Sequence, residues 1–188
     1  MNTLDAIKKR RTIRRFSSIL PRKRELLRII DCARLAPSAA NLQPLKFMIV
    51  TSKKDRLNLY PYIKYAGYIP DWNPAFDETP PAFIFILNDT KIKPSSKSEI
   101  DCGAAIANMC LAATELGLDT CWIGSVEREK ANELLNIPIH LDIMYVLGVG
   151  YGLQTGKIID MENNNHKYYL DKSGNLVVPK RKLKDIIL

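Results

Sequence analysis

Residues 98–120, SEIDCGAAIANMCLAATELGLDT, decide the fold class of this 188-residue chain. The stretch has the length of a long helix, and Gly117 suits the left-handed position that commonly follows a helix end. Its residues are small and apolar on nearly every side, which is typical of a helix surrounded by other elements. The sequence therefore predicts a central buried helix against which the other elements pack.

Shorter elements are expected on both sides of this helix. Further helices are predicted over residues 3–9 with Asn2 or Thr3 as cap, from Pro21 to before Pro37, from Ser52 until Pro61 interrupts, and over 127–136. Strands are predicted over the apolar runs 46–50, 82–89, 119–126 and 142–151, the third of which runs into a turn. Strands that alternate with helices predict three layers, a sheet with helices on both faces. We interpret residues 1–188 as one domain, with 153–188 as a polar tail of low periodicity.

Composition and charge narrow the classes of function. The net charge is +8, and six basic residues fall within the first fifteen, namely Lys8, Lys9, Arg10, Arg11, Arg14 and Arg15. Such a cluster forms a solvated face, or it binds an anionic small ligand through planar guanidinium groups. Nucleic acid is a less favoured partner, because no aromatic residues interleave with the basic ones. With no signal core and no apolar run long enough to span a bilayer, we expect a cytoplasmic protein without a membrane partner.

Cysteine and histidine spacing offers no metal site. The four cysteines form no CxxC pair, and three of them lie in apolar stretches where buried free thiols are expected. His140 and His166 stand alone, and no serine lies in a nucleophile elbow. Because acid–base and hydrolytic chemistry lack visible residues, any reactivity would have to come from a cofactor.

The glycine-rich run 148–157, GVGYGLQTGK, is not a nucleotide-binding motif. A dinucleotide fingerprint lies between a first strand and a helix, whereas this run follows the last predicted strand. A P-loop needs four residues between a first glycine and Gly-Lys, followed by a Ser or Thr, and neither condition is met. We interpret these glycines as positions of close packing at a strand exit.

Three separated segments make sense together if they bind one ligand with a phosphate, a polyol and a flat heteroaromatic ring. RRTIRRF at 10–16 offers guanidinium groups and a hydroxyl, and PSAANLQP at 37–44 offers amides and a hydroxyl. CWIGS at 121–125 offers backbone N–H groups beside a glycine that permits close approach. The alternative for 37–44 is that its polar residues serve only as turn residues.

These segments, with DCGAAIANMCLAATELGLDTCWIG, give the chain a resemblance to the FMN-dependent nitroreductase family. The resembling motifs occur in the family's order from Leu4 to about Gly152, with a weaker echo at VPKR, 178–181. Thr12 replaces the usual serine and Leu45 the usual aromatic residue, and the helical excursion near the substrate pocket of larger members is missing. The resemblance implies an α+β fold, a mixed, mostly antiparallel sheet, and a homodimer whose C-terminal tails wrap the partner.

The resemblance also implies which residues bind the cofactor. Arg10 would contact the phosphate, Arg14 would lie near the pyrimidine edge of the ring as electrostatic support, and the turn 37–43 would come from the other subunit. The implied FMN-binding residues are Arg10, Arg11, Thr12, Arg14, Pro37, Ser38, Ala39, Asn41, Gln43, Trp122, Ile123, Gly124, Lys180 and Arg181. For Trp122, a place in the hydrophobic core is the favoured alternative.

The implied activity is electron transfer from NADH or NADPH through FMN to a small acceptor, such as a nitroaromatic or a quinone, in a ping-pong cycle. The expected assembly is a homodimer with shared FMN sites and no nucleic acid. Two other functions remain open, a non-catalytic flavin-binding or sensing protein and a basic nucleic-acid-binding domain.

Overall fold

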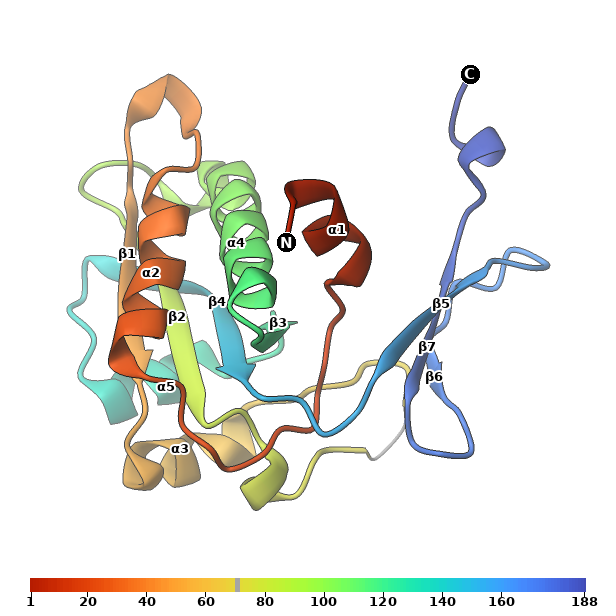
Figure 1. Ribbon diagram of the computed structural model, residues 1–188. Helices are drawn as coiled ribbons and strands as arrows, with labels where there is room; N and C mark the ends of the chain where they lie inside the picture. Colours follow the sequence, from red (N-terminus) through yellow and green to blue (C-terminus); the bar gives the residue numbers. More distant parts are fainter. Residues whose placement is uncertain (70–71) are drawn as a thin grey trace.

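The computed structural model describes residues 1–69 and 72–188, and its centre is a four-stranded sheet (Figure 1). The strands follow the order β1-β2-β4-β3, and each neighbouring pair is antiparallel. Their bounds are β1 (Leu45–Val50), β2 (Ala82–Asp89), β3 (Asp119–Ile123) and β4 (Leu141–Gly150). Three of them lie within one residue of the apolar runs that predicted them, and β3 ends three residues before its run does, where the expected turn begins. The predicted α+β class is confirmed.

The helices also begin and end close to the predicted residues. They are α1 (Thr3–Lys9), α2 (Lys23–Arg34), α3 (Lys53–Leu59), α4 (Glu99–Glu115) and α5 (Arg128–Leu135), with short 3-10 turns η1 (Ala39–Asn41), η2 (Tyr60–Tyr62), η3 (Phe76–Glu78), η4 (Ser95–Lys97) and η5 (Leu183–Asp185). Asn2 caps α1 and Ser52 caps α3, each accepting a hydrogen bond from the third residue on. One start was wrong: α2 begins two residues after Pro21, because Glu25 accepts a hydrogen bond from the Arg22 N–H and caps the helix there.

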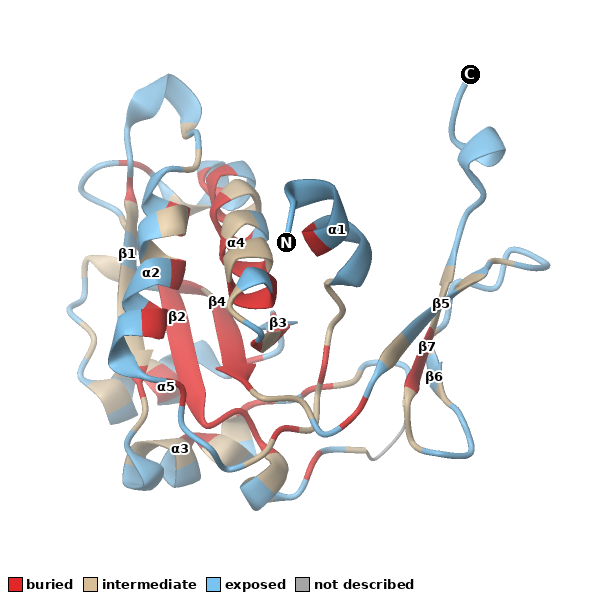
Figure 2. Ribbon diagram, viewed as in Figure 1, coloured by how far each residue is buried: buried red, intermediate tan, exposed pale blue. Residues whose placement is uncertain are grey.

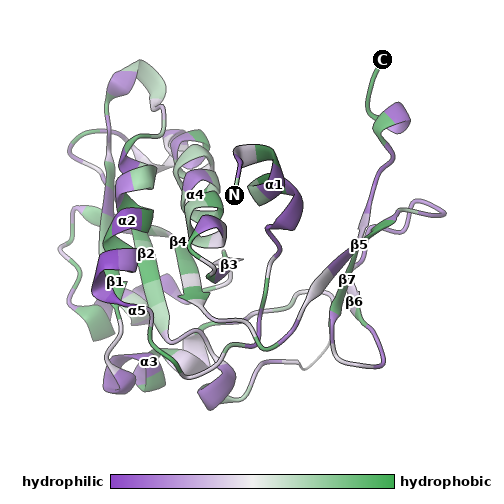
Figure 3. Cartoon of the chain, viewed as in Figure 1, coloured by the Kyte–Doolittle hydropathy of each residue, from purple (hydrophilic) through white to green (hydrophobic). Residues whose placement is uncertain are grey.

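The alternation of side chains along β2 builds two separate cores. Ala82, Ile84 and Ile86 pack with α2 and α4 on one face of the sheet. Phe83, Phe85 and Leu87 pack with residues of α3 and α5 on the other. Figure 2 shows β2 and β4 almost entirely buried, and Figure 3 shows hydrophobic residues along the same two strands. The expected three layers are therefore present.

Helix α4 is central, but it is buried on only part of its surface. Residues such as Ile106 and Met109 are fully buried against the sheet and α2. In the single chain, Ile100 is 85% exposed and Ala107 is also exposed. The prediction of a helix covered on all sides was too strong, since one apolar side of α4 still faces outward.

The tail is more ordered than its sequence predicts. Residues 153–188 contain a second sheet in the order β5-β7-β6, made of β5 (Gly156–Asp160), β6 (Tyr169–Leu170) and β7 (Leu176–Lys180). The expected irregular tail was wrong because its strands are short and only Leu176 and Val177 among their residues are buried, which leaves little apolar periodicity to read. The last residues, 186–188, are apolar and exposed, and Figure 1 shows them pointing away from the main sheet.

Two further expectations can be compared with the structure. All four cysteines are free, and Cys102, Cys110 and Cys121 are buried as predicted. Within the parts of the chain that the structure describes, none of the helices combines the length and apolar character needed to cross a membrane.

The glycines at the exit of β4 are close-packing positions, as the sequence indicates. A Cβ atom on Gly148 would overlap the Pro80 ring, and one on Gly150 would lie 2.6 Å from Cδ of Pro81 and 3.0 Å from the Phe16 ring. Rigid proline rings leave little room for adjustment, so these glycines allow β4 to lie against the chain that precedes β2.

We predict that Gly150→Ala destabilises the protein by about 1–3 kcal/mol through overpacking. The matched control is Gly103→Ala in α4, where an added Cβ meets no atom within 4 Å. That change should raise the free energy of unfolding by roughly 0.5–1 kcal/mol, because alanine has less backbone freedom to lose than glycine. Urea unfolding of both variants measures the difference, and equal stabilities would contradict the packing role of Gly150.

Candidate functional site

The basic segment 10–16 lies along the outer edge of the main sheet. Thr12 forms a parallel bridge with Thr120 of β3, and the Ile13 N–H donates to the Thr120 carbonyl at 3.0 Å. Ile13 and Phe16 are buried and anchor the segment in the second core. Arg10 and Thr12 line a cavity instead, and Arg14 contacts the Tyr65 carbonyl.

Gln154 holds this segment in place from the far end of the chain. Its Oε1 accepts hydrogen bonds from the backbone N–H groups of Arg14 (2.7 Å) and Arg15 (3.0 Å). Its Nε2 donates to the Gly174 carbonyl at 3.1 Å, and the residue is only 8% exposed. A single buried amide thus joins the basic segment to the tail sheet.

A cavity of about 470 Å³ opens beside Arg10. Its lining residues are Ile7, Arg10, Thr12, Ala107, Cys110, Leu111, Thr120 and Trp122. Within the described ranges, the hydrogen bonds of Arg10 use its main chain, so its guanidinium is free for a ligand. Burial raises the pKa of the Cys110 thiol, which therefore stays protonated at neutral pH and is not a nucleophile.

A second cavity, of 400 Å³, adjoins the first at Trp122. Ile123 and Gly124 line it, together with Lys64, Tyr65, Ala66, Gly67, Ile69 and Ser125. A Cβ on Gly124 would be in ordinary contact with the Tyr145 ring at 3.6 Å, so packing does not require this glycine. Gly124 lines the cavity with its backbone, since it has no side chain.

Trp122 is not a core residue, so that alternative was wrong. Its side chain is 43% exposed and borders both cavities, because β3 is the edge strand of the sheet. The indole packs edge-to-face against Tyr145, with ring centroids 5.3 Å apart. A fixed indole between two cavities provides a wall for a flat ligand.

The basic cluster divides into free and occupied side chains. Lys8 and Lys9 are exposed, and Arg15 forms a bidentate ion pair with Glu78 at 2.7 and 2.5 Å. The arginine holds the pKa of the Glu78 carboxyl below its usual range. Part of the cluster is therefore a solvated face, as one of the two interpretations expected.

Arg11 and Arg14 are both partly buried and line neither cavity. The Arg14 Nε donates to the Tyr65 carbonyl at 2.5 Å, and its guanidinium lies over the Tyr168 ring, 4.5 Å from the centroid. The Arg11 stem packs against Gly156, and its Nε is buried without a partner in the described residues. Their assignment to FMN remains a prediction.

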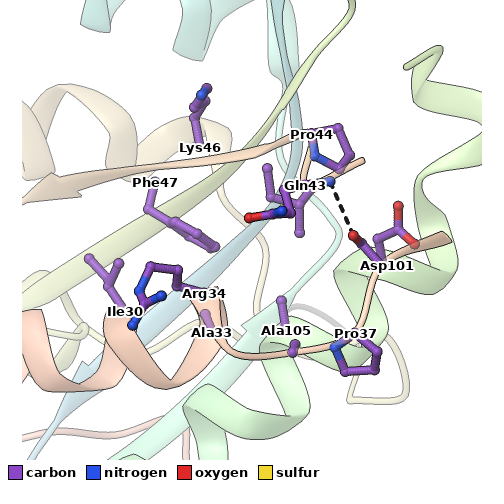
Figure 4. Close-up of a pocket in the computed structure, with 13 residues that line it drawn as sticks. Ile30, Ala33, Arg34, Pro37, Gln43, Pro44, Lys46, Phe47, Asp101 and Ala105 are labelled. Atoms are coloured by element: carbon purple, nitrogen blue, oxygen red, sulfur yellow. Dashed lines mark hydrogen bonds between the residues drawn. The ribbon is translucent and has the colours of Figure 1, made fainter. Parts of the chain in front are cut away.

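The turn 37–44 is strained and mostly exposed. Ala40, Asn41 and Gln43 all have left-handed backbone angles, with φ between 51° and 55°. The Gln43 N–H donates to Ser38 Oγ at 3.1 Å, the contact drawn dashed in Figure 4, and Gln43 Nε2 donates to the Asn41 carbonyl. Turn chemistry therefore uses part of these polar groups, while the Asn41 side chain is exposed.

The structure does not bring the two groups of predicted residues together within one chain. Pro37, Ser38 and Gln43 line a different cavity, of 370 Å³, with residues of α2, β1 and α4, and Ala39 and Asn41 line none of the three cavities. In Figure 1 this turn and the segment after α1 lie on opposite sides of α4. Lys180 and Arg181 are exposed in the tail and also line none of the three, and Arg181 donates to Asn164 at 2.8 Å.

Sequence reasoning missed several residues that organise the site. Gln154 lies in the glycine-rich run that was rejected as a phosphate loop, and a lone amide after a strand gives little signal. Tyr168 lies in a polar tail, and only its aromatic character sets it apart. Asp101 offered a clearer signal, since a carboxylate in the first turn of an apolar helix needs a partner when buried.

The residues around Trp122 fit FMN. A free guanidinium and two threonine hydroxyls match a phosphate and its neighbouring polyol. The exposed indole and the open backbone at Gly124 match a flat ring with hydrogen-bonding atoms at its edge. The donor set is therefore suitable for the cofactor that the resemblance implies.

Comparison with known proteins agrees with this interpretation. The model of the nitroreductase family matches residues 7–151. An Archaeoglobus fulgidus protein, an NADH dehydrogenase/NAD(P)H nitroreductase by name, is 30% identical over 154 residues, with 79% of this chain and 84% of that protein covered. The FMN reductase (NADPH) of Bacillus subtilis is 27% identical, with 80% of this chain and 66% of that protein covered. The structure of an FMN-dependent nitroreductase from Clostridium difficile R20291 matches with a TM-score of 0.67 at 26% identity, with 90% and 93% covered.

We predict that Gln154→Leu lowers the free energy of unfolding by about 3 kcal/mol, because it leaves two partly buried N–H groups and one partly buried carbonyl without their partner. Hydrogen exchange of the Arg14 and Arg15 amides should become about tenfold faster or more. Gln154→Glu is the control for the acceptor, since it retains an oxygen for both amides, while its second oxygen faces the Gly174 carbonyl in place of the donor. Unchanged exchange in the leucine variant would contradict the role of Gln154.

Proposed function

Because the chain belongs to the nitroreductase family, it is an NAD(P)H-dependent oxidoreductase that uses FMN, and we propose that it reduces a small flat acceptor by a ping-pong mechanism. The proposed acceptors are nitroaromatics and quinones. The observation that carries the proposal is the pair of adjoining cavities at Trp122, one with a free guanidinium and the other with an open backbone turn.

Arg10, Thr12, Ile123 and Gly124 would hold the cofactor. Arg10 supplies a charge-assisted contact to the phosphate, and Thr12 supplies a hydroxyl beside it. The backbone N–H groups at 123 and 124 would contact the ring, because both residues line the second cavity. FMN, when bound, supplies the transfer of two electrons from NAD(P)H to an acceptor, which is chemistry that amino-acid side chains lack.

The second cavity would hold the ring of FMN, since its volume of 400 Å³ is within the range of ligand pockets, roughly 300–1,000 Å³. In the proposed ping-pong order, the nicotinamide donor leaves before the acceptor enters the same place beside the bound ring. The chain contributes orientation, because the indole is held by its contact with Tyr145.

We assign Arg14 the role of a fixed positive charge near the ring of FMN. Tyr65, whose carbonyl accepts from Arg14, also lines the second cavity. The Tyr168 ring covers the other side of the guanidinium and restricts its motion. A cation held in this way favours negative charge on a neighbouring group without any movement of the protein.

A homodimer with shared sites is also part of the proposal. The turn 37–43 and the Arg10 cavity face different directions in one chain, so a second copy is needed to bring both to one cofactor. Ile100 on α4 and residues 186–188 leave apolar surface exposed, which an isologous partner would bury twice. In this assembly the tail wraps the partner, and Lys180 and Arg181 are candidates for the phosphate.

A cytoplasmic location completes the proposal. All four cysteines are free thiols, which suits a reducing compartment. Burial raises the pKa of Cys102 and of Cys121 to about 12, so these two thiols remain protonated and unreactive there.

We predict that the purified protein is yellow and that acid releases FMN rather than FAD. Anaerobic addition of NADH or NADPH should bleach the visible absorption, and a nitroaromatic or a quinone should restore it. A colourless protein that FMN cannot reconstitute would overturn the family-based assignment. Bound FMN that dithionite reduces and neither nucleotide reduces would identify a flavin-binding or sensing protein instead.

We predict that Arg10→Glu and Asn41→Asp each abolish FMN binding alone and complement each other when co-expressed. If each site takes Arg10 from one chain and Asn41 from the other, every heterodimer has one doubly damaged site and one intact site. Random pairing should then restore roughly a quarter of wild-type FMN sites.

The control mixes Arg10→Glu with Thr12→Asp, two changes in the same segment, from which no intact site can form. Bound FMN, counted by absorbance after acid release, measures the recovery. If the chains of the first pair fold and mix but no FMN binding is recovered, residues 37–44 serve only as a turn.

A further inference from the structure

The turn that supplies Ser38 and Asn41 is held in an unfavourable backbone conformation. Ala40, Asn41 and Gln43 have φ values of 51°, 55° and 51°, a region that residues other than glycine rarely occupy. Ala40 has no polar side chain to compensate for this conformation. Such strain persists only where the surrounding structure over-determines it.

Most hydrogen bonds of the turn stay inside the turn. The N–H groups of Asn41 and Leu42 donate to the carbonyls of Ser38 and Ala39, and the Gln43 N–H donates to Ser38 Oγ. These bonds close the turn on itself but do not fix its position on the protein. In the described part of the chain, residues 38–43 have one hydrogen bond to another element, from the Ala39 N–H to Asp101 Oδ1 at 3.0 Å.

Asp101 is a buried and rigid acceptor. It lies in the first turn of α4 and is 3% exposed, and its Oδ2 accepts from Lys93 Nζ at 2.5 Å. The Lys93 carbonyl in turn accepts from Asn88 Nδ2 of β2 at 2.8 Å, and Asn88 is fully buried. Figure 4 shows the Asp101 side chain reaching from α4 toward the turn, beside the Pro44 and Gln43 side of the cavity.

We propose that Asp101 is a positioning residue, which holds the turn 38–43 in the conformation that binds FMN. This inference rests on the proposed function, because it assumes that the turn contacts FMN. A buried ion pair such as Lys93–Asp101 is a poor source of stability, since apolar residues of similar volume usually do as well or better. In this protein the ion pair fixes Oδ1 of Asp101 opposite the Ala39 N–H.

Single substitutions would not test this role cleanly. Asp101→Leu alone leaves the Lys93 ammonium buried without a counter-charge, which destabilises the whole protein. We therefore compare two double variants that both remove the buried charges, Lys93→Met with Asp101→Asn and Lys93→Met with Asp101→Leu. Asparagine and leucine are similar in volume, and only asparagine keeps an acceptor for Ala39.

Of the two double variants, the one with the lower melting temperature should have the higher affinity for FMN. The asparagine double buries an amide N–H₂ without a partner, so its melting temperature in the FMN-free form should be the lower one. It should nevertheless bind FMN about tenfold more tightly than the leucine double, because the turn is still anchored. Titration of FMN fluorescence into the FMN-free proteins gives both dissociation constants, and calorimetry gives both melting temperatures.

Equal affinities, or affinities that follow the melting temperatures, would show that Asp101 has a structural role only. A second measurement needs no variant, since the Ala39 amide of the wild type should exchange its hydrogen more slowly than the Ala40 amide. Exchange of Ala39 at an unprotected rate would overturn the proposal even if neither double folds. Failure of the wild type to bind FMN would instead overturn the proposed function.

Discussion

Strand β2 has seven consecutive buried residues, 82–88, so both of its faces are shielded from water. A strand buried on both sides needs a layer of helices on each, and the other elements follow from this requirement. α2 and α4 cover the face of Ile84, and α3 and α5 cover the face of Phe85. Burial of each such side chain stabilises the fold by about 1.5–3 kcal/mol, which makes β2 the main support of both cores.

The candidate site lies at the edge of the sheet, where the burial of the strands ends. β3 is the edge strand, with β4 on one side and the segment 10–16 on part of the other. An edge strand keeps backbone groups available for pairing, and here Thr120 uses them to hold the basic segment. The same edge position leaves the Trp122 indole outside the core and between two cavities. The functional surface is therefore a consequence of strand order.

Helix α4 separates the two groups of residues proposed to bind one cofactor. Its first turn carries Asp101, which contacts the turn 37–44 through Ala39. Its later residues Ala107, Cys110 and Leu111 line the cavity of Arg10. The cavity beside this turn and the cavity of Arg10 share no lining residue, so the proposed shared site takes its turn from a second chain. The outward apolar side of α4 is suited to that contact.

Features that depend on near neighbours could be predicted from the sequence, because caps and side-chain periodicity involve only a few residues. Asn2 and Ser52 cap their helices, Gly117 follows α4 with φ of 76°, and β2 alternates between two cores as its apolar run indicates. The tail sheet escaped prediction because its strands have too few buried residues to produce a pattern.

The amino-acid sequence by itself determined the layers, the central helix and the family to which the motifs belong. Only the tertiary structure decided which arginine side chains of those motifs are free to bind a ligand. The Arg15 guanidinium is paired with Glu78, 63 residues away, and the Arg14 guanidinium donates to the Tyr65 carbonyl, 51 residues away, whereas the Arg10 guanidinium faces a cavity. Such choices depend on burial and charge between segments distant in the chain, and these distances exist only after the chain has folded.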